Sequence, residues 1–183
     1  MARPIEHRAE FGFPAEQVYA ALIDETYLRE RLAAIGGRES ELVSHTVEPG
    51  PDGGGGTGGG PDGGPAGGTV RAVMRQGIDA EFLPPVVKRI TPNGVIIERT
   101  ETWRAGTPYR GTIAAQVNGM PGTLDGGSTL TDTATGSTLS FDARIKVSIP
   151  LVGGKIEAVI ADQLGQLLRA ESRFTARWLE NRR

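Results

Sequence analysis

One change of hydrophobic pattern, between residues 137 and 178, constrains the fold more than any other feature of this chain. From Leu139 to Ile149 every second residue is apolar and the residues between are polar, the pattern of a strand with one buried face. Beyond a short loop, apolar residues recur three or four positions apart, which predicts a long amphipathic helix from Lys155 to Trp178. Because only one face of the strand is apolar, the helix is expected to cover one side of a sheet.

The rest of the pattern predicts the order of the other elements. Alternation from Ile5 to Phe11 indicates a first strand, and Pro14 and Asp24, residues favoured at helix starts, predict two short helices after it. Six consecutive strands then precede the final helix, which indicates an α+β fold with a curved antiparallel sheet of about seven strands. These six strands are predicted at Glu39 to Glu48, Thr69 to Ile78, Val95 to Arg104, Tyr109 to Val117, Gly122 to Thr131 and Leu139 to Ile149.

Two segments do not fit this pattern of helices and strands. Residues 49–68 are dominated by glycine and cannot bury enough surface to offset their ordering entropy, so we expect a flexible loop. They do not fit a phosphate-binding loop, because they lead into a strand at Thr69. Closure entropy grows only logarithmically with loop length, so the flanking strands can still pair, and residues 1–183 are expected to form a single domain. The apolar segment Phe82 to Val87 contains two prolines, which indicate a lid or a short turn.

The composition narrows the classes of partner and chemistry. The 183 residues include 20 Lys and Arg against 22 Asp and Glu, so the formal charge of −2 gives no field that attracts nucleic acid. There is no cysteine, and His7 and His45 show no metal-ligand spacing, so we assign no metal and no cofactor. The N-terminus has no apolar signal segment and no run of about 18 apolar residues occurs. We therefore expect a cytoplasmic protein without stable membrane insertion.

Arg99 and Glu101 are the most informative polar residues. On their predicted strand they share a face with Ile97 and Trp103, which places an ionisable pair among apolar residues. A desolvated Glu101 beside Arg99 could anchor a ligand head group or transfer a proton. Two simpler interpretations stay open: the face bends outward and both groups are solvated, or the pair satisfies itself as a structural ion pair.

Other ionisable residues have simpler interpretations. His7 alternates with polar residues on the face of Ile5 and Phe11, which is typical of a hydrogen-bonded core or cavity-edge histidine. Along the predicted C-terminal helix, acidic residues interrupt a basic stripe, which indicates a solvated face rather than a nucleic-acid surface. This stripe consists of Arg169, Arg173 and Arg177, interrupted by Glu171 and Glu180.

Two segments carry a resemblance to known proteins. The element order, together with the segment FGFPAEQVY at Phe11–Tyr19, resembles the START/Bet v 1-like (SRPBCC, helix-grip) superfamily of polyketide cyclases, lipid-transfer proteins and relatives. The segment KVSIPLVGGKIE at Lys146–Glu157 is similar to the signature of DUF2505, an actinobacterial family within it. The resemblance covers nearly the whole chain, except that the Gly-rich run replaces a short hairpin. It implies a curved seven-stranded sheet gripping the C-terminal helix, with a hydrophobic ligand cavity between them.

From these observations we expect a binding module that holds an apolar small molecule or lipid between sheet and helix. An alternative is an enzyme of cyclase or dehydratase type, acting on a polyketide-like substrate, with Glu101, Tyr109 or His7 transferring protons in the same cavity. A third possibility is an interaction protein with a filled core. We assign no catalytic residue, leave the oligomeric state open and name Arg99, Glu101 and His7 as polar anchors. The expected lining residues are Met74, Ile97, Trp103, Tyr109, Ile113, Phe141, Ile145, Ile156, Ile160 and Leu164.

Overall fold

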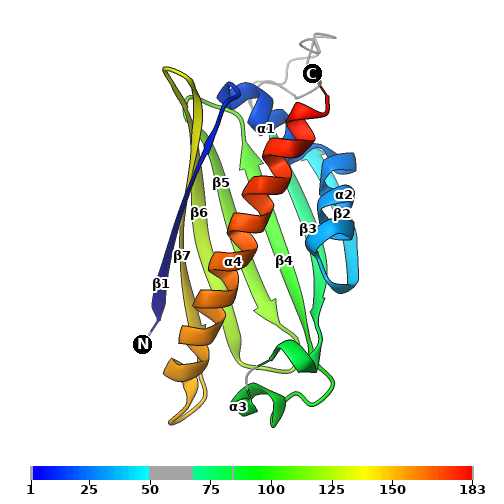
Figure 1. The fold of residues 1–183 in the computed structure, drawn as a ribbon, viewed down its shortest axis with the longest axis vertical. Coiled ribbons are helices and arrows are strands. Elements are labelled where there is room, and N and C mark those ends of the chain that lie inside the picture. The colour runs from blue at the N-terminus through cyan, green and yellow to red at the C-terminus, as the bar shows by residue number, and fades with distance from the viewer. Residues whose placement is uncertain (1, 50–67, 84, 183) are drawn as a thin grey trace.

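The predicted α+β architecture is confirmed by the computed structural model, which describes residues 2–49, 68–83 and 85–182 (Figure 1). All but the two end residues of the predicted Gly-rich loop lie outside these ranges. The described chain forms one seven-stranded antiparallel sheet with helices on one face. The elements in chain order are β1 (Arg3–Phe11), α1 (Ala15–Ile23), α2 (Glu25–Ile35), β2 (Arg38–Glu48), β3 (Thr69–Ile78), a 3-10 turn (Ala80–Phe82), α3 (Pro85–Lys88), β4 (Val95–Arg104), β5 (Tyr109–Val117), β6 (Gly122–Thr133), β7 (Gly136–Val147) and α4 (Gly153–Glu180).

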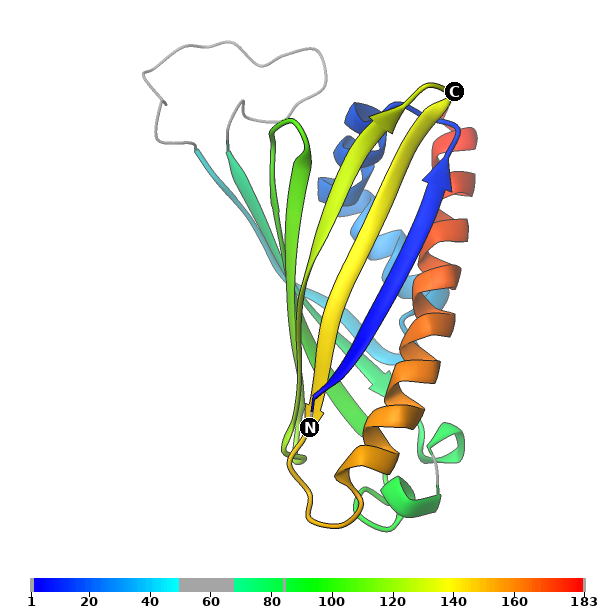
Figure 2. The same ribbon diagram turned by 90° about the vertical axis from the view of Figure 1, so that its left-hand side faces the viewer.

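The sheet is ordered β1-β7-β6-β5-β4-β3-β2, so the first strand pairs with the last. All neighbouring strands are antiparallel, and β3 pairs with β2 across the Gly-rich segment. The sheet curves, with β1 and β7 running close beside α4 and the strands toward β2 diverging from it (Figure 2). The main contacts of α4 are accordingly with β1 and β7 and with α1 and α2.

Helices α1 and α2 begin where the sequence predicts, after Pro14 and Asp24. The Asp24 carboxylate accepts a hydrogen bond of 2.7 Å from the Tyr27 N–H, a standard N-cap for α2. The first N–H of α1, that of Ala15, donates to Asp132 at 2.7 Å, so the hairpin between β6 and β7 caps this helix from a distance. At the end of α2, Gly37 adopts φ of 73°, and a Cβ there would lie 2.5 Å from the carbonyl oxygen of Gly77.

The connection from β7 to α4 is held by a buried side chain. Glu157, near the start of α4, accepts a hydrogen bond of 2.9 Å from the backbone N–H of Val147, the last residue of β7. Gly153 opens the helix where a Cβ would lie 2.4 Å from the carbonyl oxygen of Val147. The change of hydrophobic pattern between residues 137 and 178 therefore corresponds to a tight corner between β7 and α4, held by a hydrogen bond across it.

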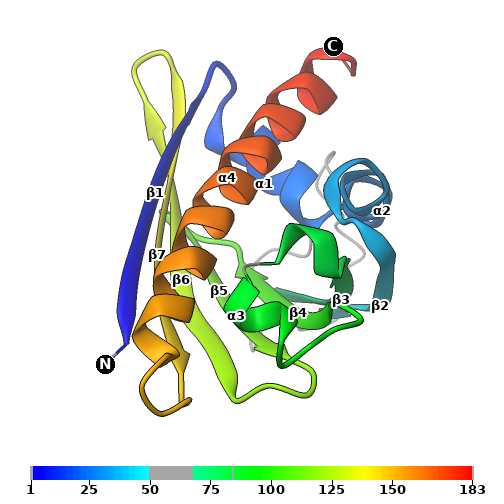
Figure 3. The same ribbon diagram turned by 60° about the horizontal axis from the view of Figure 1, so that its bottom comes forward.

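The buried apolar residues form two clusters along the length of the sheet. One cluster joins α1 and α2 to the upper part of the sheet, as drawn in Figure 1, and to the end of α4, around Tyr27 and Leu130. The other, called the lower apolar cluster, joins β5, β6 and β7 to the first half of α4, around Ile145 and Ile156. At the described ends of the proline-containing segment, the 3-10 turn (Ala80–Phe82) and α3 lie at the lower end of the sheet near the beginning of α4 (Figure 3).

Candidate functional site

A cavity of about 650 Å³ lies between the lower half of the sheet and α4. Its volume falls within the usual range of small-molecule sites, about 300–1,000 Å³. Apolar side chains from β4 to β7 form one wall, and those of α4 form the opposite wall. The apolar lining includes Ile97, Ile113, Leu124, Ile145, Val147, Ile160, Leu164 and Leu167. The core is thus not filled along its whole length.

The mouth of the cavity is polar and runs along one side of α4. Gln163, Gln166 and Arg173 line the cavity and are also exposed to solvent, so they mark its opening. Across the opening, Arg38 and Asp79 form an ion pair of 2.7 Å. A ligand entering here would pass between polar groups before reaching the apolar walls.

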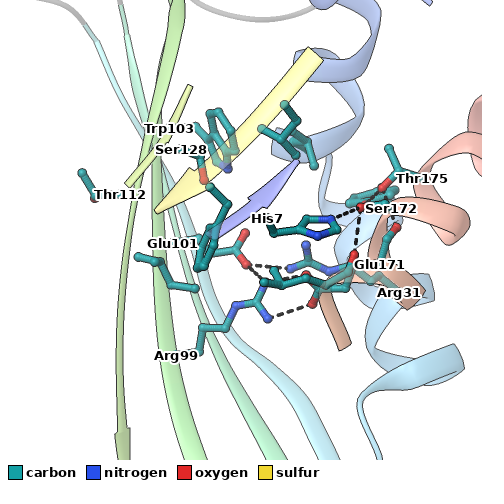
Figure 4. Close-up of a pocket in the computed structure, with 16 residues that line it drawn as sticks. His7, Arg31, Arg99, Glu101, Trp103, Thr112, Ser128, Glu171, Ser172 and Thr175 are labelled. Carbon is teal, nitrogen blue, oxygen red and sulfur yellow. Dashed lines mark hydrogen bonds and ion pairs between the residues drawn. The ribbon is translucent and has the colours of Figure 1, made fainter. Parts of the chain in front are cut away.

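A smaller polar pocket of about 60 Å³ adjoins the same interior (Figure 4). Four charged side chains converge on it from three elements, and each is only 3% to 8% exposed. Arg31 comes from α2, Arg99 and Glu101 from β4, and Glu171 from α4. We call these four residues the charged quartet. Arg99 lines both the pocket and the larger cavity.

The charged quartet is bonded in a chain of alternating sign. Arg99 Nη1 donates to Glu171 Oε1 at 2.7 Å, and Arg99 Nη2 donates to Glu101 Oε1 and to Glu171 Oε2. Arg31 Nη2 donates to the same Glu101 oxygen at 3.1 Å and also contacts the sulfur of Met74 at 3.2 Å. Two guanidinium groups therefore balance two carboxylates, and the cluster as a whole carries no net charge.

These contacts fix the ionisation of the quartet. Burial by itself would raise the pKa of Glu101, but the attraction of Arg31 and Arg99 outweighs it and lowers that pKa to about 2. Burial opposes the charge of both arginines, but the facing carboxylates raise the pKa of each guanidinium. Glu101 is therefore a carboxylate near neutral pH, and it holds no proton to give.

His7 lies at the edge of the polar pocket and is hydrogen-bonded to α4. Its Nε2 lies 3.0 Å from the Ser172 hydroxyl, which itself donates to the carbonyl oxygen of Leu168 at 2.8 Å. Because that hydroxyl has one hydrogen, it accepts from His7, and the neutral imidazole then carries its proton on Nε2. Burial and nearby Arg169 lower the pKa of His7, while Glu171 partly opposes them. His7 is the hydrogen-bonded pocket-edge residue that the sequence predicts.

The structure brings most of the expected site residues together. Ile97, Ile113, Ile145, Ile160 and Leu164 line the larger cavity. Trp103 and Phe141 line the smaller pocket, as do all three expected polar anchors. The interpretation in which Arg99 and Glu101 bend outward into solvent is wrong, because both are buried and form ion pairs.

Three of the expected lining residues lie elsewhere. Met74 is fully buried under α2, in contact with Arg31. The ring of Tyr109 stacks on that of Tyr19 from α1, with centroids 4.4 Å apart. Ile156 has no exposed surface and packs into the lower apolar cluster. Met74 and Tyr109 lie where α1 and α2 fill the interior, and Ile156 points toward the packed strands and not into the cavity.

The sequence patterns considered above do not identify two members of the charged quartet, Arg31 and Glu171. The prediction of a solvated helix face is wrong for Glu171, which is buried, whereas Arg169, Arg173 and Glu180 are exposed. Helical spacing carries the missing signal. Arg31 follows the buried Tyr27 by four positions, and Glu171 lies between Leu168 and Thr175 on one stripe of α4, so both charges occupy inward positions.

Other kinds of site receive no support from the described residues. Within residues 2–49, 68–83 and 85–182, no group of three or more His, Asp or Glu side chains converges as a metal site. In the same ranges no helix is both long enough and apolar enough to cross a bilayer. The chemistry available in the interior is apolar contact, together with the hydrogen bonds and charges of the polar pocket.

Comparison with known proteins identifies the family of this chain. The model of the family described as "Protein of unknown function (DUF2505)" matches residues 6–179. An uncharacterized protein of Mycobacterium tuberculosis is 30% identical over 189 residues, which cover 99% of both chains, and one from Mycobacterium bovis matches equally well.

Solved structures share the fold at low sequence identity. A Thermus thermophilus protein superimposes with a TM-score of 0.54 at 14% identity, covering 94% of this chain and 97% of that one. A START superfamily protein from Mycobacterium smegmatis gives a TM-score of 0.51 at 11% identity, covering 98% and 99%. With a family match across nearly its whole length and the START/Bet v 1-like helix-grip fold, this chain belongs to the DUF2505 family.

Proposed function

We propose that the protein binds and carries a hydrophobic small molecule or lipid in the cavity between the sheet and α4. The observation that carries this proposal is the cavity of about 650 Å³, whose walls are apolar and whose mouth is polar. A ligand that buries about 300 Å² of apolar surface would gain about 7 kcal/mol before ordering costs, at roughly 25 cal/mol per Å².

The enzyme alternative finds less support in the geometry. Of the three groups considered for proton transfer, Tyr109 lies outside both cavities. Glu101 is held as a carboxylate with a pKa of about 2, far from the value that suits a general base near neutral pH. His7 is engaged through its Nε2 with Ser172. We therefore keep binding as the proposed function.

Two measurements test the proposal. Native mass spectrometry of the protein purified from its own host is expected to detect a co-purified apolar molecule that organic extraction removes. Titration of the extracted protein with a fluorescent apolar probe is expected to saturate at one site. A protein that carries no molecule and binds neither fatty acid, sterol, polyketide nor probe would contradict the proposal.

A further inference from the structure

The charged quartet leaves one donor unused at the inner end of the cavity. Arg99 makes hydrogen bonds through Nη1 and Nη2, but its Nε–H is buried and has no partner among the described residues. A buried donor without a partner is costly, by roughly the desolvation of that group. Arg99 lines the larger cavity as well as the pocket, so a ligand whose oxygen reaches this buried Nε–H would supply the missing acceptor.

The balance of charge restricts what that acceptor can be. Arg99 is already neutralised by Glu171 and Glu101, and Arg31 is paired with Glu101. A ligand carboxylate at Arg99 would add a third negative charge to a buried group that holds two positive ones. Within the charged quartet such a charge has no counter-ion left, so it is disfavoured there. A neutral oxygen, by contrast, accepts the hydrogen bond without disturbing the balance.

We infer, on the basis of the proposed function, that the ligand is a neutral, largely apolar molecule with one oxygen acceptor. This oxygen, of a carbonyl, ether or hydroxyl group, accepts a hydrogen bond from the Arg99 Nε–H. The apolar part occupies the space between Ile97, Ile160 and Leu164. The oxygen lies at the part of the wall formed by Arg99, within hydrogen-bond distance of its Nε. A free acid is a poor ligand in this orientation.

Three probes of nearly equal shape test the inference on the wild-type protein. They are acetylanthracene, ethylanthracene and anthracenecarboxylic acid, substituted at the same ring position, and their binding is followed by energy transfer from tryptophan. A hydrogen bond from a charged donor predicts that the ketone binds about tenfold or more tighter than the hydrocarbon. The acid is expected to bind no tighter than the hydrocarbon. Equal affinity of ketone and hydrocarbon, or tightest binding of the acid, overturns the inference.

A paired variant removes the donor without leaving a charge unpaired. In Arg99→Met with Glu171→Met, one positive and one negative group are lost together, and the pair of Arg31 with Glu101 remains. The variant is expected to bind ethylanthracene about as well as wild type and to lose the preference for the ketone, and an unchanged preference contradicts the inference. If the variant does not fold, the wild-type series decides alone. Failure of all three probes to bind would instead count against the proposed function.

Discussion

Two isoleucines one helical turn apart on α4 have different surroundings, one in a packed core and the other in the cavity wall. Ile156 has no exposed surface and packs into the lower apolar cluster. Ile160 is half-buried and lines the cavity. Both residues share the same helix, side-chain shape and sequence neighbourhood, so a difference between their variants reports the space around them.

Replacement by glutamine is expected to affect mainly stability at Ile156 and mainly ligand binding at Ile160. Ile156→Gln loses a fully packed side chain and buries an amide without partners, so it should lower the free energy of unfolding by about 4 kcal/mol. Ile160→Gln removes contacts on one side only and leaves the amide within reach of water in the cavity, so it should cost about 1 kcal/mol. A bound apolar ligand must displace that water, so its affinity should fall about tenfold.

Urea unfolding followed by tryptophan fluorescence gives the stabilities, and titration with an apolar probe gives the affinities. Asp162→Asn, on the exposed face of α4, is the matched control and should change neither. If Ile156→Gln does not fold, Ile156→Val should still cost about 1 kcal/mol without weakening binding. Equal destabilisation by both glutamine variants, with probe affinity unchanged, would refute the argument, because it would mean that α4 meets a filled core at both positions.

Three further predictions, one of them with a matched control variant, test the interior. The pKa of Glu101 is depressed to about 2 in the folded state, so its stabilisation is complete above the unfolded pKa of about 4.5 and is lost as pH falls toward 2. Glu101→Gln should therefore flatten that decline in acid-unfolding curves. At pH 7 it should cost about 3 kcal/mol, because it leaves a buried guanidinium uncompensated. Gly126→Ala should destabilise by more than 2 kcal/mol in thermal unfolding, because its Cβ would lie 2.4 Å from a backbone carbonyl oxygen of β7, whereas Gly127→Ala, with its nearest contact at 3.5 Å, should be nearly neutral. Tyr27→Phe removes the buried 2.7 Å hydrogen bond to Thr175 and should cost about 1 kcal/mol by urea unfolding; no measurable loss would show that this bond adds nothing.

Much of the fold is predictable from local patterns. The predicted bounds of three strands, β3, β4 and β5, coincide with those observed, because clear alternation between turn residues marks each end. The start of α2 is predicted by a single capping residue, Asp24. Each of these signals depends on only a few neighbouring residues, so it predicts the bounds of an element without knowledge of tertiary contacts.

The site is less predictable because its residues meet through the curvature of the sheet. Alternation identifies which side chains face inward, but Met74 and Ile97 both face inward and only the second lines the cavity. The charged quartet depends on three elements that are distant in sequence, from Arg31 to Glu171. A charge at an inward helical position is visible in the sequence, but its partner is not.

The division between filled core and open cavity follows from the lengths of the elements. With about 1.5 Å per residue, α4 with 28 residues spans about 42 Å, whereas α2 with 11 residues spans about 16 Å. A strand of 10 residues such as β4 spans about 33 Å. Helices α1 and α2 therefore cover only about half of the inner face, and there they bury Met74 and meet Tyr109. Over the other half, the strands that α4 chiefly contacts are β1 and β7. The curvature of β3 to β6 there leaves a space that no described side chain fills.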